Sequence, residues 1–126
     1  MADLRTPLSR ARGLGSAKDG TSHFWHQRIT ALLMIPLVLW AGFSLALRPM
    51  DHASLLAWVQ QPLVTIGLLL LIINVFYHAK MGLQTVIEDY VSTHGRRTMM
   101  LLVANLACLL FGILGVVSVL KLALGN

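Results

Sequence analysis

Apolar residues occur along this chain in three long stretches that contain no charged side chain. The stretches cover residues 29–47, 53–79 and 98–120. A helix needs about 20 apolar residues to cross the hydrocarbon core of a bilayer, so each stretch is long enough for one crossing. A second crossing within one stretch would leave backbone groups unpaired in lipid. The pattern therefore predicts an all-α integral membrane protein with three transmembrane helices.

The first predicted helix follows a polar N-terminal segment. Residues 1–20 mix basic residues with aspartates, serines and glycines and have no apolar core of the kind found in a secretory signal. We expect this segment to be a flexible cytoplasmic arm, and residues 21–126 to form the transmembrane anchor domain. The first helix is expected from about residue 23 to residue 47, with its span at about 29–47. Pro36 lies inside it, which membrane helices tolerate.

The second predicted helix begins at Pro62, because proline suits the first position of a helix. Before it, residues 53–59 form a modestly apolar segment with Trp58, which is suited to an anchoring position in the membrane interface. The span of the second helix is expected at about 62–80. Apolar residues recur beyond it at helical spacing, which predicts an amphipathic continuation into the headgroups. These residues are Leu83, Val86, Ile87, Tyr90 and Val91.

A polar segment separates the second helix from the third. We expect residues 94–97 to form this turn and the third helix to run from about 98 to 122, with its span at about 99–120. Cys108 is the single cysteine and lies inside this span, where it has no disulfide partner in the chain. We therefore expect it to be a small buried apolar residue.

Composition agrees with a membrane location. Hydrophobic residues make up 56% of the chain, charged residues only 12%, and the mean hydropathy is +0.73. Soluble domains carry about 25% charged residues, so a soluble fold is excluded. The net charge of +5 and the pI of 10.2 would otherwise suggest a nucleic-acid partner. In a membrane protein, however, the position of the basic residues along the chain matters more, and no nucleic-acid partner is expected.

The basic residues fall mainly on one predicted side of the membrane. Eight precede the first span or lie between the second and third, and two lie on the opposite side. The eight are Arg5, Arg10, Arg12, Lys18, Arg28, Lys80, Arg96 and Arg97, and the two are Arg48 and Lys121. Because basic loops remain in the cytoplasm, this asymmetry predicts a cytoplasmic N-terminus and an external C-terminus.

His78 is the one histidine of the chain that lies within a predicted span. Ionisable residues inside spans are rare and mark functional sites. Gly82 follows four residues later on the same helix face and removes a side chain where a flat porphyrin would lie. Imidazole is a common axial ligand of haem iron, but an interhelical hydrogen bond explains His78 as well. The periodicity leaves both interpretations open.

Three further polar residues lie near the predicted cytoplasmic surface. Asp89 and Tyr90 follow His78 by about 16 to 18 Å along the helix. A tyrosine hydroxyl can donate to a quinone carbonyl and a carboxylate can relay protons, although for these residues taken alone an interfacial aromatic and a solvated helix end are the simpler explanation. Arg28, at the base of the first span, can pair with haem propionates or a quinone, or be an ordinary snorkelling arginine.

Two segments together resemble a known family. They are HQRITA at residues 26–31 and HAKMGLQTVIEDYV at residues 78–91. These segments resemble the cytochrome b anchor of succinate dehydrogenase, in its smaller D-type form and particularly in alphaproteobacteria. The resemblance rests on an arginine followed by threonine and alanine in the first segment. In the second it rests on a histidine with glycine four residues later and Asp-Tyr eleven and twelve residues later.

The resemblance implies a b-type haem held between this chain and a larger three-helix cytochrome b anchor subunit. It implies that His78 is one axial ligand of the haem iron, that Tyr90 with nearby Asp89 lines the ubiquinone site, and that Arg28 lies near the haem propionates or the quinone. The other implied partners are a flavoprotein subunit and an iron–sulfur subunit. FAD and iron–sulfur clusters would reside in those partners, because this chain has neither a dinucleotide fingerprint nor a cysteine cluster.

The resulting hypothesis is an anchor subunit of succinate:ubiquinone oxidoreductase, the respiratory complex II, in a bacterial inner membrane. Such a subunit does not oxidise succinate on its own, but helps form the site where ubiquinone is reduced. The alternatives are the anchor of a quinol:fumarate reductase, and a small membrane transporter or assembly protein without a redox centre. The Arg-rich start of the chain also leaves a mitochondrial inner membrane open as the location.

Overall fold

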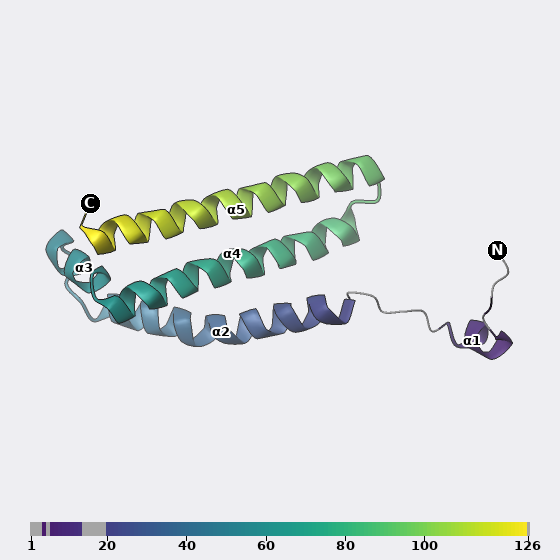
Figure 1. Cartoon of the computed structure of the whole chain (residues 1–126), viewed down its shortest axis with the longest axis horizontal. Helices are drawn as coiled ribbons and strands as arrows, with labels where there is room; N and C mark the ends of the chain where they lie inside the picture. Colours follow the sequence, from purple (N-terminus) through teal and green to yellow (C-terminus); the bar gives the residue numbers. More distant parts are fainter. Residues whose placement is uncertain (1–3, 5, 14–19, 126) are drawn as a thin grey trace.

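The computed structural model describes residues 4, 6–13 and 20–125. These residues form five helices and no strand: α1 (Pro7–Arg12), α2 (Gly20–Ala46), α3 (His52–Val59), α4 (Pro62–Tyr90) and α5 (His94–Leu124) (Figure 1). Three of them, α2, α4 and α5, are long and apolar enough to cross a membrane. The predicted all-α fold with three spans is confirmed.

The predicted N-terminal arm is described only in part. Within it, residues 7–12 form the short helix α1. The remaining arm residues 1–3, 5 and 14–19 lie outside the described part of the chain. The flexibility of the arm therefore stays a prediction.

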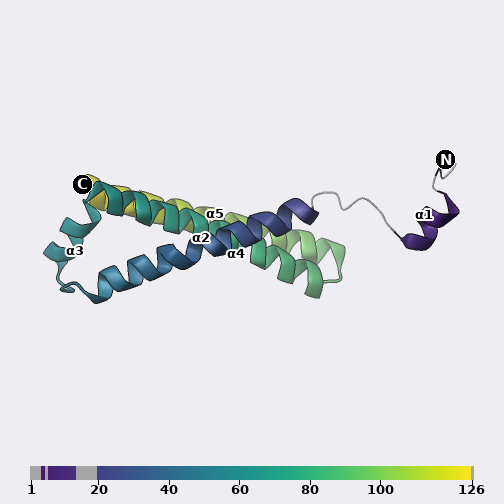
Figure 2. The ribbon, with the colours of Figure 1, turned by 90° about the horizontal axis from the view of Figure 1, so that it is seen from below.

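Helix α4 is the central element of the membrane domain. It packs against α2 and against α5, whereas α2 and α5 do not contact each other within the described residues. Figure 2 shows that α2 crosses the α4 and α5 pair at an angle, so that α2 and α4 separate toward the end where α3 connects them. Much of the apolar surface of α2 and α5 consequently faces outward. Such surfaces suit lipid or further membrane helices.

Helix α3 packs against α4 and α5 at the end where α2 and α4 diverge. Asp51 caps it, because the Ser54 backbone N–H donates to Asp51 Oδ2 at 2.9 Å. Hydrogen bonds from the Ser54 side chain and backbone hold the pKa of Asp51 below its usual value. Charged at neutral pH, the carboxylate keeps its capping role there.

Trp58 on α3 is packed against other residues of this chain, whereas its sequence context suggested a position in the membrane interface. Only 3% of its surface is exposed, and it forms a cluster with Val59 and Val64. Its ring centroid lies 6.0 Å from that of Trp40 on α2. The amphipathic segment folds back onto the diverging helices, because burying an aromatic ring there fills the space between them.

The connection between α4 and α5 differs from the prediction. Residues 94–97, which were expected to form the turn, are instead the first turn of α5. Thr93 occupies the N-cap position, and its carbonyl accepts the Arg97 backbone N–H at 2.9 Å. Arg97 Nε donates to the Val91 carbonyl at 2.8 Å. This bond pairs the Val91 carbonyl, which lies in the short connection between α4 and α5.

Candidate functional site

His78 lies on the face of α4 that packs against α2. Its Nδ1 atom is 2.9 Å from the Thr30 hydroxyl oxygen, which also lies 2.8 Å from the His26 carbonyl and 3.0 Å from the Gln27 carbonyl. A carbonyl can only accept, so the single hydroxyl proton points to these carbonyls. With its proton directed there, the hydroxyl oxygen can accept a hydrogen bond from His78 Nδ1. This tautomer leaves His78 Nε2 unprotonated and able to bind a metal.

The predicted interhelical hydrogen bond of His78 is therefore confirmed. It does not exclude haem ligation, because it uses Nδ1 and leaves the other ring nitrogen unused. Among the described residues, none forms a hydrogen bond to His78 Nε2, and the imidazole is only half-buried. Histidines that bind metals generally donate their second ring N–H to a neighbouring acceptor, as His78 does here.

Asn74 lies one turn before His78 on α4 and also forms a hydrogen bond to Thr30 of α2. Its side-chain Nδ2 donates to the Thr30 carbonyl at 2.8 Å. Thr30 and Asn74 are the two buried polar residues of the described chain, with 8% and 9% of their surfaces exposed. Neither residue was predicted from the sequence. The available signal was an amide four residues before His78, on the same face of a span.

Gly82 leaves open space beside His78, as predicted. A Cβ atom built at this glycine would have no neighbouring heavy atom within 4 Å. The described residues contain no group of three or more His, Cys, Asp or Glu side chains that could hold a metal ion. Binding of a haem iron does not need such a group, because one histidine from each of two helices supplies both axial ligands. His78 with a free Nε2 and a neighbouring gap fits the role of one of these ligands.

Asp89 and Tyr90 lie at the far end of α4. Tyr90 is the last residue of the helix, 82% of its surface is exposed, and Asp89 is exposed as well. The 12 helical residues from His78 place Tyr90 about 18 Å away along the axis. The residues that the structure describes do not close a pocket around either side chain. Both are accessible to a ligand or to a partner subunit.

Arg28 does not approach His78 within this chain. It precedes Thr30 by two residues, which places it about 200° around α2 from the residue that faces His78. Its guanidinium instead lies over the Phe24 ring, with 5.2 Å from Cζ to the ring centroid. A role for Arg28 near haem propionates or a quinone stays a prediction and would have to involve the outer face of α2.

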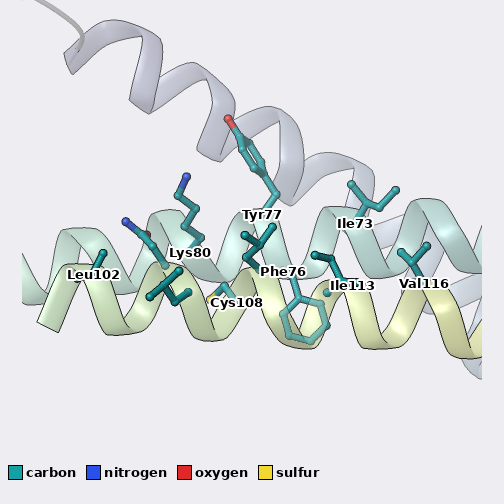
Figure 3. A pocket seen from close by; sticks show the side chains of 12 residues that line it. Ile73, Phe76, Tyr77, Lys80, Leu102, Cys108, Ile113 and Val116 are labelled. Atoms are coloured by element: carbon teal, nitrogen blue, oxygen red, sulfur yellow. The ribbon is translucent and has the colours of Figure 1, made fainter.

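A groove of 480 Å³ runs between α4 and α5, on another face of α4 from His78. Its lining is mainly apolar and includes Ile73, Phe76 and Cys108, while Tyr77 and Lys80 point away from α5 in Figure 3. Cys108 is buried, with 8% of its surface exposed, as predicted. The sequence analysis did not anticipate this groove, because its lining combines residues from two helices.

Three apolar helices, with a buried polar contact around a histidine inside one span, define a multi-pass α-helical membrane protein with a candidate cofactor ligand. Comparison with known families specifies this class further. The family described as the succinate dehydrogenase/fumarate reductase transmembrane subunit matches residues 2–114. The chain belongs to this family.

Curated relatives agree with this assignment. A protein of Rickettsia bellii is 35% identical over 117 residues, which are 92% of this chain and 90% of the relative. A protein of Rickettsia conorii is 30% identical over 109 residues, 85% of this chain and 86% of the relative. Both are named succinate dehydrogenase hydrophobic membrane anchor subunit, in agreement with the alphaproteobacterial resemblance. No solved structure matches.

Proposed function

We propose that this chain is the hydrophobic membrane anchor subunit of a succinate dehydrogenase complex, the respiratory complex II, in a bacterial inner membrane. The observation that carries the proposal is the similarity to the Rickettsia bellii anchor over 92% of this chain. The three apolar helices agree with such a role. The chain contributes to the membrane part of the complex and does not oxidise succinate itself.

The complex needs partners for the chemistry that this chain lacks. The proposed partners are a flavoprotein subunit with FAD, an iron–sulfur subunit with the clusters, and a larger cytochrome b anchor subunit. The single cysteine of this chain supports the assignment of the clusters to a partner. The outward-facing apolar surfaces of α2 and α5 support packing against the larger anchor within the membrane.

His78 is proposed to be one axial ligand of a b-type haem shared with the larger anchor. Support comes from the free Nε2 atom, the Nδ1 hydrogen bond to Thr30 and the open space at Gly82. When bound, the haem supplies a one-electron redox centre within the membrane. The contribution of this chain is to hold the ring of His78 in a fixed orientation and protonation state. Arg28 is proposed to lie near the propionates or the quinone.

Tyr90 and Asp89 are proposed to act at the ubiquinone site. The exposed Tyr90 hydroxyl would donate a hydrogen bond to one quinone carbonyl, and the neighbouring Asp89 carboxylate would pass on a proton taken up from water when the quinone is reduced. Their exposure at the end of α4 supports access from the surface where a soluble partner would dock. The iron–sulfur subunit and the larger anchor would supply the remaining walls of the pocket.

The family also includes fumarate reductase subunits, so a quinol:fumarate reductase anchor is the second candidate. It would run similar chemistry in the opposite direction. The family match favours either anchor over a transporter or an assembly protein.

The experiment is purification of the native complex through a tag on this chain, followed by subunit identification and a reduced-minus-oxidised absorption spectrum. The proposal expects a co-purified flavoprotein, iron–sulfur protein and second anchor, with b-type haem bands and succinate:ubiquinone reductase activity. Isolation of the chain without a flavoprotein contradicts the anchor role. A complex that oxidises menaquinol with fumarate faster than it reduces ubiquinone with succinate favours the fumarate reductase anchor.

A further inference from the structure

We propose that Thr30 is a positioning residue for His78, which fixes the tautomer and orientation of the imidazole so that Nε2 is presented to the haem iron. This inference rests on the proposed function, because it concerns how the same ligand is held. Thr30 itself touches neither the iron nor the quinone. It acts through the 2.9 Å hydrogen bond between its hydroxyl oxygen and His78 Nδ1.

The direction of this hydrogen bond is set by the backbone of α2. The His26 and Gln27 carbonyls lie 2.8 and 3.0 Å from the Thr30 hydroxyl oxygen and can only accept. The hydroxyl proton is therefore committed to α2, and the oxygen presents a lone pair to α4. The tautomer of His78 with its proton on Nδ1 donates to this lone pair. Nε2 is then the nitrogen with the free electron pair that a metal requires.

The position of the Thr30 hydroxyl is fixed by a second contact between the same helices. Asn74 Nδ2 donates to the Thr30 carbonyl at 2.8 Å. Asn74 and His78 are one turn apart on α4. His78 contacts the side chain of Thr30, and Asn74 contacts its backbone carbonyl. Threonine is also restricted about χ1, which limits the positions open to its oxygen. Thr30 and Asn74 are both buried, so the bond between them is shielded from water.

A hydrogen bond to the outer nitrogen of a ligating imidazole changes the metal site. It increases the electron donation of the ring to the metal and thereby stabilises the ferric form. Loss of such an outer contact typically weakens metal binding by about 10- to 100-fold. Removal of the Thr30 hydroxyl is therefore expected to raise the haem midpoint potential and to shift the low-spin electron paramagnetic resonance signal as the ring turns.

The test compares three variants in the purified complex. Thr30→Val replaces the hydroxyl by a methyl group at similar volume, Thr30→Ser retains a hydroxyl, and Thr65→Val is the matched control. Thr65 is suitable because its hydroxyl donates to the Val59 and Gln61 carbonyls and contacts no histidine. The measurements are the haem midpoint potential, the low-spin resonance signal and the rate of haem loss to apomyoglobin. A purely structural threonine would alter assembly in Thr30→Val and Thr65→Val without moving the potential.

The proposal expects a raised potential, a shifted signal and about 10- to 100-fold faster haem loss in Thr30→Val. Values near wild type are expected in Thr30→Ser and Thr65→Val. If Thr30→Val does not assemble, Thr30→Ala provides the same comparison. Unchanged potentials and signals in the valine or alanine variant overturn the positioning role. A haem potential in Thr30→Ser that is shifted as far as in Thr30→Val also overturns it.

The same experiment separates this inference from the proposed function. A wild-type low-spin haem that His78→Ala alters, together with an unaffected Thr30→Val, leaves ligation by His78 standing and removes only the role of Thr30. A wild-type complex without haem, or one whose haem signal is unaltered by His78→Ala, overturns ligation and positioning together.

Discussion

The imidazole of His78 has two nitrogens, and hydrogen bonds among the described residues use only Nδ1. The sequence identified the residue because an ionisable side chain in a span is conspicuous. It could not identify the partner, because Thr30 lies 48 positions away and is a common residue in membrane helices. The two interpretations of His78, hydrogen bond and haem ligand, are compatible because they use different ring atoms.

Asp89 and Tyr90 were identifiable from the sequence for a different reason. They lie on the helical continuation beyond the span, and the structure extends α4 to Tyr90 as expected. What closes around them was not predictable, because Tyr90 is left 82% exposed by the described part of the chain. When a pocket is built from several chains, each sequence contains only some of the residues that line it.

We predict that Tyr90→Phe impairs quinone reduction and leaves assembly of the complex intact. The change removes one hydroxyl donor and keeps the aromatic ring. Loss of a neutral hydrogen bond worth about 0.5 to 1.5 kcal/mol corresponds to about a 2- to 12-fold lower kcat/KM for ubiquinone. The measurement is succinate-driven reduction of a soluble ubiquinone analogue over a range of concentrations.

Tyr77→Phe is the matched control for Tyr90→Phe. Tyr77 lies on the same helix and is also partly exposed, but it lines the groove between α4 and α5. Its phenylalanine variant should reduce quinone like the wild type. Equal kinetics for wild type and Tyr90→Phe would remove Tyr90 from the quinone site.

At the scale of elements, helix lengths followed from the sequence and helix contacts did not. The spans were predictable because the bilayer requires a minimum apolar length. The role of α3 was not, because its apolar face suits the membrane interface as well as a protein interior. Its burial depends on the divergence of α2 and α4, where the Trp58 ring packs beside Trp40.

Gly67 of α4 lies against the Trp40 side chain of α2, where an added methyl group would be too close. A Cβ atom there would lie 2.7 Å from Trp40 Cη2, and the Trp40 ring is itself packed against Trp58. We predict that Gly67→Ala destabilises the membrane domain by about 1 to 3 kcal/mol through overpacking. The measurement is the thermal unfolding midpoint of the detergent-solubilised complex.

Gly42→Ala provides the control, since a Cβ atom at Gly42 would have no neighbour within 4 Å. Both variants add one methyl group to a membrane helix and have the same effect on intrinsic helix propensity. Only Gly67→Ala should lower the midpoint. Equal midpoints for the two variants would show that Trp40 moves aside without loss of packing.

At the scale of the whole molecule, the three helices form an open arrangement and not a closed bundle. α2 and α5 contact α4 from different sides and leave large apolar faces uncovered (Figures 1 and 2). The number of spans was predictable from local composition, but the crossing of α2 was not, because it depends on packing between distant residues. The cytoplasmic location of the N-terminus stays a prediction from the eight-to-two distribution of basic residues.

The central claim is that this chain anchors a succinate dehydrogenase complex and contributes His78 to a haem shared with a second subunit. The most direct measurement is the reduced-minus-oxidised spectrum of the purified His78→Ala complex. His52→Ala is the control, because His52 lies at the start of α3, outside the spans. The account predicts shifted or absent b-type haem bands in His78→Ala and a wild-type spectrum in His52→Ala. An assembled His78→Ala complex with an unaltered low-spin spectrum would contradict the account.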